Sequence, residues 1–149
     1  MMREYPLLFI LIVFSALFSA SEIALVVANK GKLQVRARKK KIGASVALAL
    51  VNSPEKFLST VLVGNNIVNI SLSSIAAIFL QHYFHSSDTI ITVIIAFVIL
   101  LFGELVPKSL ARLVADAIVS YAAIFLQACR IVLFPFIWFT QSSSRIIVS

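Results

Sequence analysis

The sequence predicts an all-α membrane protein with three transmembrane helices per subunit, and two observations lead to this fold class. The chain has 149 residues, of which 60% are hydrophobic and 13% are charged, and its mean hydropathy is +1.03. Soluble domains carry about 45–50% apolar and about 25% charged residues, so one soluble core of this size could not hide so much apolar surface. Three stretches are also long and apolar enough for membrane helices, which need about 20 residues each.

The first predicted span covers residues 6–28 and is interrupted only by Glu22. Its apolar run is longer than that of a usual signal peptide and lacks a small-residue cleavage site before a soluble body, so we interpret it as a permanent span. Seven of the 13 basic residues follow it: Lys30, Lys32, Arg36, Arg38, Lys39, Lys40 and Lys41. Because basic residues concentrate in cytoplasmic loops, this stretch is predicted to be cytoplasmic and the N-terminus to be outside.

The second predicted span covers residues 56–80 and follows juxtamembrane or interfacial helices over residues 30–52. Ser53 as the N-cap, Pro54 at the first helical position and Glu55 in the first turn form a consistent helix start. The loop over residues 81–88 contains no Lys or Arg, which indicates that it lies outside the cell.

The third predicted span covers residues 89–112 and is broken near its end. Pro107 lacks an N–H and clashes with the carbonyl four residues earlier, which frees the carbonyl of Gly103 beside the carboxyl group of Glu104. The stretch after it, about residues 117–148, is apolar but interrupted by Arg130 and Pro135, which favours an interfacial helix over a fourth span. The C-terminus is then cytoplasmic.

Polar side chains inside the spans are the informative ones, because each costs free energy in a bilayer. In the first span Ser15, Ser19 and Glu22 share one helical face, as Asn65 and Asn69 do in the second. With the third-span motif, these positions supply oxygen ligands from three helices. A ligand set of oxygen atoms that includes a carboxylate favours a hard cation such as Mg²⁺, Ca²⁺ or Na⁺, and disfavours zinc and copper. Because carboxylates are few, the affinity is expected to be modest, which suits a transported ion.

Structural roles for the same residues remain open at this point. The two serines also fit a small-residue packing pattern between helices, and the asparagines could form interhelical hydrogen bonds. Glu22 could pair with a lysine such as Lys30. Glu104 is the hardest to explain structurally, because an ionisable group at the centre of a membrane helix costs about 2.5–3.5 kcal/mol.

Three ordered motifs resemble the transmembrane domain of the CorC/CNNM (cyclin M) magnesium transporter family, and the resemblance covers nearly the whole chain. The motifs are Ser15-Ala-Leu-Phe-Ser19-Ala-Ser-Glu22, Gly64-Asn65-Asn66-Ile-Val-Asn69 and Gly103-Glu104-Leu-Val-Pro107-Lys108. The Asn52-Ser-Pro54-Glu55 connection is also similar to the family's entry into its second span.

The resemblance implies a homodimer and an inward-facing cavity that holds a largely dehydrated Mg²⁺. The implied ligands are Ser15, Ser19, Asn65, the Gly103 carbonyl and Glu104. Glu22, Asn66 and Asn69 are secondary candidates, and Pro107 lies in the turn that exposes the carbonyl. Family members normally continue into a pair of CBS domains that bind ATP. We therefore expect residues 1–149 to form one transmembrane domain, with ATP acting only through such domains downstream.

The function predicted from the sequence is Mg²⁺ export through a multi-pass protein of the plasma or inner membrane, with Na⁺ entry as the driving force that the family resemblance implies. The alternative is a membrane anchor or Mg²⁺ sensor that does not transport. No enzyme is expected, because the sequence has no nucleophile–base pair and no Gly-rich phosphate loop. The basic stretch favours contact with anionic membrane lipids over nucleic acid, because it lies between two spans.

Overall fold

A computed structural model describes residues 4–84 and 88–148, and every element in these ranges is helical. The elements are α1 (Glu4–Val27), α2 (Lys30–Arg38), α3 (Ala44–Asn52), α4 (Pro54–Phe84), α5 (Asp88–Val98), the π-helix η1 (Ile99–Leu105) and α6 (Val106–Val148). Helix α4 begins at Pro54, the position predicted for its first residue. The all-α fold class is therefore confirmed.

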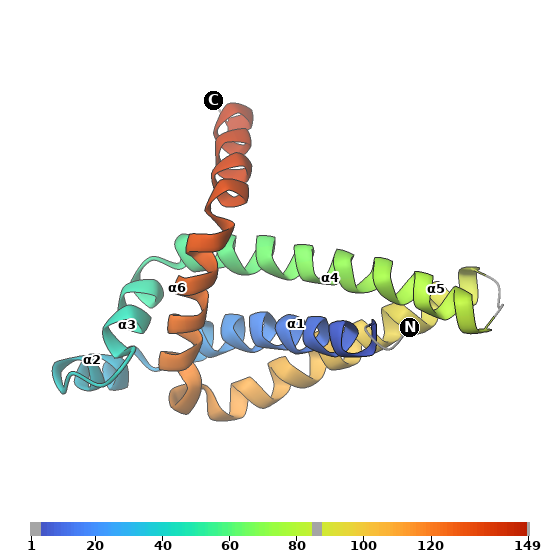
Figure 1. Cartoon of the computed structure of the whole chain (residues 1–149). Helices are drawn as coiled ribbons and strands as arrows, with labels where there is room; N and C mark the ends of the chain where they lie inside the picture. Colours follow the sequence, from blue (N-terminus) through green and yellow to red (C-terminus); the bar gives the residue numbers. More distant parts are fainter. Residues whose placement is uncertain (1–3, 85–87, 149) are drawn as a thin grey trace.

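Three helical stretches are long and apolar enough to cross a membrane, as predicted. They are Pro6–Val27 in α1, Phe57–Gln81 in α4 and Thr89–Pro135, which begins in α5. The third stretch continues through η1 into α6 without leaving a helical path. The three run side by side along the long axis of the molecule in Figure 1.

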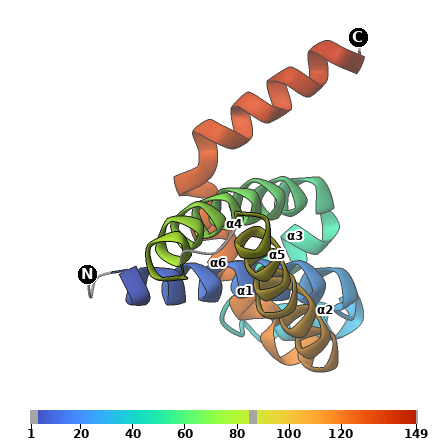
Figure 2. The same ribbon diagram turned by 90° about the vertical axis from the view of Figure 1, so that its right-hand side faces the viewer.

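Helix α6 changes direction at Val114, where the backbone torsions (φ −117°, ψ 18°) are not helical. Beyond this kink α6 crosses the ends of the other spans, so we end the third span at Val114 (Figure 1). The view along the spans shows that the last part of α6 leaves the bundle altogether (Figure 2). The residues of α6 after Val114 therefore run in a different direction from the third span and are not part of it.

The basic stretch and the residues after it form two short helices, α2 and α3, at one end of the spans, which we call the basic end. The tight turn between them has positive φ angles at Lys40 (53°) and Gly43 (72°). A Cβ atom on Gly43 would lie 2.5 Å from the carbonyl oxygen of Ser120 in α6. Glycine is required there because the turn is left-handed and the backbone of α6 lies against it.

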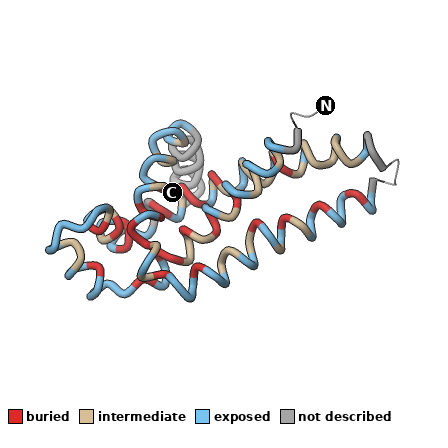
Figure 3. The backbone as a smooth tube through the Cα atoms, turned by 60° about the horizontal axis from the view of Figure 1, so that its bottom comes forward, coloured by how far each residue is buried: buried red, intermediate tan, exposed pale blue. Residues whose placement is uncertain are grey.

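Two hydrophobic clusters hold the spans together. The larger lies at the basic end, where α1, α3, α4 and α6 meet, and includes Phe18, Leu25 and Leu126. The smaller lies toward the opposite end and contains Leu72, Ile91, Ile95 and Ile99. Along the third span buried positions recur once per turn, facing the other helices (Figure 3).

Candidate metal site

A layer of polar groups lies between the two hydrophobic clusters, and Ser15 on α1 is at its centre. The Ser15 side chain is completely buried. Its hydroxyl lies 2.7 Å from Oδ1 of Asn69, 3.4 Å from Oδ1 of Asn65 and 3.5 Å from the carbonyl oxygen of Gly103. One hydroxyl proton cannot serve three acceptors, so oxygen lone pairs converge here in excess of donors.

The third span contributes a carboxylate to this layer. The amide Nδ2 of Asn69 donates a hydrogen bond to Oε1 of Glu104 at 3.3 Å. Asn69 therefore contacts α1 through its oxygen and the third span through its nitrogen. This contact fixes the orientation of the amide and holds Glu104 beside Ser15. We call the set of Ser15, Asn65, Asn69, Gly103 and Glu104 the polar layer.

The π-helix η1 places Gly103 and Glu104. At its end the N–H of the next residue, Val106, bonds to the carbonyl of Leu101, five residues earlier. Pro107 follows and has no N–H to offer to the Gly103 carbonyl. The predicted break is thus a widened helical turn, a feature that often marks functional sites. Gly103 is buried, and a Cβ atom there would lie 2.7 Å from the Ser15 hydroxyl, so only glycine lets the two helices approach this closely.

Ser19 lies one turn along α1 from Ser15 and is also completely buried. Its hydroxyl oxygen has no hydrogen-bond partner among the described residues. Leaving a buried hydroxyl without a partner costs about 1–3 kcal/mol. An unpaired oxygen next to a group of excess acceptors fits a position that a bound cation would satisfy.

Glu22 forms an ion pair with Lys108, whose Nζ lies 3.0 Å from Oε2 of Glu22. Glu22 thus pairs with a lysine, as suggested, but the partner is Lys108 and not Lys30. The reason is the crossing of α1 and α6, which brings Lys108 to the face of α1 that carries Glu22, whereas Lys30 lies in the next helix. The two side chains of the pair remain about one-third exposed.

The structure does not join every predicted residue to the polar layer. Asn66 is exposed, and no hydrogen bond of the layer described above reaches it. Among residues 4–84 and 88–148, no group of three or more His, Cys, Asp or Glu side chains could hold a metal ion. The candidate ligands are accordingly hydroxyls, amide oxygens, a backbone carbonyl and one carboxylate, which together fit a hard cation.

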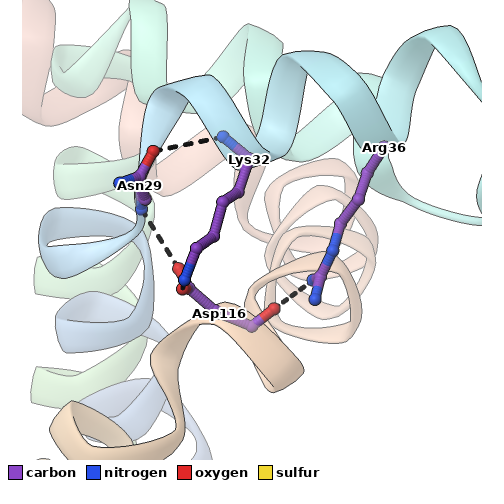
Figure 4. A network of polar contacts seen from close by, with 4 residues as sticks. All are labelled: Asn29, Lys32, Arg36 and Asp116. Carbon is purple, nitrogen blue, oxygen red and sulfur yellow. Dashed lines mark hydrogen bonds and ion pairs between the residues drawn. The ribbon is translucent and has the colours of Figure 1, made fainter.

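A second polar cluster lies at the basic end, around Asp116 just beyond the kink of α6 (Figure 4). The carboxylate of Asp116 accepts hydrogen bonds from Nζ of Lys32 at 2.6 Å and from the backbone N–H of Asn29 at 3.2 Å. Arg36 donates to the Asp116 carbonyl, and the Asn29 side chain caps α2 by accepting from the N–H of Lys32. We call these four residues the Asp116 cluster.

The Lys32 hydrogen bond, followed by that of the Asn29 N–H, lowers the pKa of Asp116 below its usual value. The cluster therefore keeps Asp116 ionised and ties the start of α2 to the segment after the kink.

Sequence reasoning missed two of these relations. No role is predicted for Asp116 from the sequence, although it follows the end of the third span that is predicted to be cytoplasmic, on the same side as the seven basic residues, and this is a signal for an ion pair. No role is predicted for Lys108 from the sequence either, although it follows Glu104 by four residues. That spacing was the available signal that Lys108 lies near the site.

Comparisons with known proteins identify the family of this membrane domain. The family described as the cyclin M transmembrane N-terminal domain matches residues 6–149. A UPF0053 protein of Haemophilus influenzae is 34% identical over 148 residues, covering 96% of this chain and 35% of the relative. The UPF0053 inner membrane protein YfjD of Escherichia coli is 30% identical over 135 residues, covering 90% and 32%.

A third relative, the UPF0053 protein YrkA of Bacillus subtilis, is 32% identical over 154 residues, covering 93% of this chain and 36% of its own. The chain thus spans about a third of the length of the curated relatives that it matches.

Proposed function

The chain belongs to the cyclin M (CorC/CNNM) family of membrane proteins, and on that premise we propose that it transports Mg²⁺ across the membrane. The observation that carries the proposal is the polar layer: three spans converge on Ser15 with oxygen atoms in excess of donors and a single carboxylate. The Mg²⁺ ligands that we propose are Ser15, Ser19, Asn65, the Gly103 carbonyl and Glu104.

The composition of the layer suits an ion that must also leave. Mg²⁺ prefers oxygen ligands and gives up its water reluctantly. A layer with one carboxylate would bind it with moderate strength, and a transported ion requires sites that release it. Asn69 has a supporting part, because it holds Glu104 and Ser15 together from the second span.

Orientation and energetics favour coupled export. We place the basic end in the cytoplasm, because basic residues accumulate there. Moving two positive charges outward against 100 mV costs about 4.6 kcal/mol, at about 2.3 kcal/mol per charge. Inward movement of Na⁺ would supply that free energy. The family resemblance favours a homodimer, with each copy holding one polar layer.

Reconstitution of the chain in liposomes tests transport directly. We expect Mg²⁺ flux that increases with an opposing Na⁺ gradient, and loss of the flux in Glu104→Gln. Gln keeps the shape of Glu and removes its charge. Arg112→Gln is a matched control, because it removes an exposed charge of the same span eight residues away, and it should transport normally. Normal flux in Glu104→Gln would contradict the site.

The second candidate function is a Mg²⁺-sensing anchor for cytoplasmic domains, which the length of the relatives makes reasonable. It predicts saturable Mg²⁺ binding that Glu104→Gln abolishes, without flux under any Na⁺ gradient. Binding and flux measured on the same preparation therefore separate the two functions.

A further inference from the structure

The ion pair between Glu22 and Lys108 lies directly beside the polar layer, on the side of the basic end. Lys108 follows Glu104 by four residues along the third span, and Glu22 follows Ser19 by three along α1. One helical turn rises about 5.4 Å, so both charges lie about one turn from groups of the proposed Mg²⁺ site. The pair joins the same two spans, the first and the third, that carry Ser15 and Gly103.

A lysine at this position opposes cation binding. Its ammonium group repels a divalent ion one turn away, and the repulsion is twice that felt by a monovalent ion. Glu22 offsets this effect through its 3.0 Å contact with the Lys108 nitrogen. The two side chains are 31% and 33% exposed, so water screens the pair only in part.

We propose that Glu22 and Lys108 set the affinity of the polar layer for Mg²⁺ without contacting the ion. Lys108 lowers the affinity, and Glu22 keeps that reduction moderate by neutralising most of the lysine charge. The net charge of Glu22, Lys108 and Glu104 is −1. Without the lysine it would be −2, which would hold a divalent ion too strongly for release. This inference rests on the proposed function of the polar layer.

Four variants test the proposal by their effect on the Mg²⁺ concentration that half-saturates binding, measured by calorimetry on the purified chain in detergent. Lys108→Met should lower this concentration about tenfold and Glu22→Gln should raise it about tenfold, which corresponds to about 1.4 kcal/mol in each direction. In the double variant Lys108→Met/Glu22→Gln, the half-saturating Mg²⁺ concentration should be close to that of the unmodified protein. Lys108→Arg keeps the charge and should change little.

The dependence on ion charge distinguishes an electrostatic role from a structural one. Because repulsion scales with ion charge, Lys108→Met should raise the affinity for Na⁺, measured by its competition with Mg²⁺, only about threefold. This factor is the square root of the tenfold effect expected for Mg²⁺. Arg112→Met is the matched control, since it removes a positive charge one further turn along the same helix, where the side chain is exposed. It should leave the Mg²⁺ midpoint unchanged.

The possible results separate clearly. If Lys108→Met weakens Mg²⁺ binding or leaves it unchanged, the proposal is wrong and the pair is structural. If the double variant binds as weakly as Glu22→Gln, then Glu22 is itself a ligand and the proposal is also wrong. If the unmodified chain shows no saturable Mg²⁺ binding, or Glu104→Gln binds normally, then the proposed function fails independently.

Discussion

The polar layer and the Asp116 cluster both join helices that are far apart in the sequence. They differ in whether their polar groups have enough hydrogen-bond partners within the protein. The carboxylate of Asp116 receives an ammonium group and a backbone N–H, and it is partly exposed to solvent. In the polar layer, Ser15 is completely buried among several acceptors, and beside the layer the Ser19 hydroxyl has no partner among the described residues.

This contrast separates groups that stabilise the fold from groups that are available to a ligand. A carboxylate whose partners are all supplied by the protein gains nothing from a cation. A buried group with excess lone pairs carries a free-energy cost that a bound cation would remove. We therefore expect substitutions in the polar layer to change Mg²⁺ binding and substitutions in the Asp116 cluster to change stability.

The largest effect is expected for Gly103→Ala. The added Cβ atom would lie 2.7 Å from the Ser15 hydroxyl, which would push the serine away from the layer. Displacing a group that orients a metal site typically costs 10–100-fold in affinity, and we expect the upper part of that range in calorimetric Mg²⁺ titrations.

The double variant Gly103→Ala/Ser15→Ala is the control for folding. It removes the clashing hydroxyl, and the remaining contact of 3.4 Å to the Ser15 Cβ is ordinary. It should recover the thermal stability of the unmodified chain but not its Mg²⁺ affinity. Recovery of affinity as well would show that the Ser15 oxygen is not a ligand.

Ser19→Ala should have effects of opposite sign on stability and on binding. Removing an unpaired buried hydroxyl should raise the stability of the ion-free protein by about 1 kcal/mol, because a polar atom without a partner disappears. Mg²⁺ affinity should fall about tenfold as one ligand is lost. Thermal unfolding without Mg²⁺ and titration with Mg²⁺ measure the two effects, and a loss of stability would contradict the assignment.

A smaller effect is expected for Asp116→Asn, which leaves Lys32 without its acidic partner. The pair is partly exposed, so its loss should cost about 0.5–1 kcal/mol and lower the unfolding temperature by about 1–4 °C. The Mg²⁺ midpoint should not change. A change in the midpoint would mean that the kink of α6 and the polar layer are coupled.

The smallest expected effect is that the difference in unfolding temperature between the unmodified chain and Asp116→Asn depends on pH. Asp116 lies outside the spans, and its hydrogen bond from Lys32 holds its pKa below the usual value of about 3.8. A depressed pKa stabilises the folded state above the unfolded pKa, and this stabilisation is lost as the pH falls through the folded pKa. The unfolding temperatures of the unmodified chain and Asp116→Asn should therefore converge below pH 4 in a pH series. A constant difference would show that the carboxylate charge is not responsible.

Much of the fold could be predicted from local patterns. Apolar runs of sufficient length, the start of α4 at Pro54 and the irregularity near Pro107 all depend on residues close in sequence, and the structure has each of them. The partner of Glu22 could not be predicted in this way. It depends on how α1 crosses α6, and side chains far apart in sequence meet only when the helices pack.

The candidate site also has one part that the sequence predicts and another that depends on the tertiary structure. The sequence by itself determined that polar residues of the three spans share helical faces, because the period of a helix is fixed by its backbone. Only the tertiary structure decided that Ser15 is the meeting point, that Asn66 stays exposed and that Lys108 pairs with Glu22. The physical reason is that helix crossing and close approach are set by packing across the bundle, such as the contact that Gly103 permits, which no local period encodes.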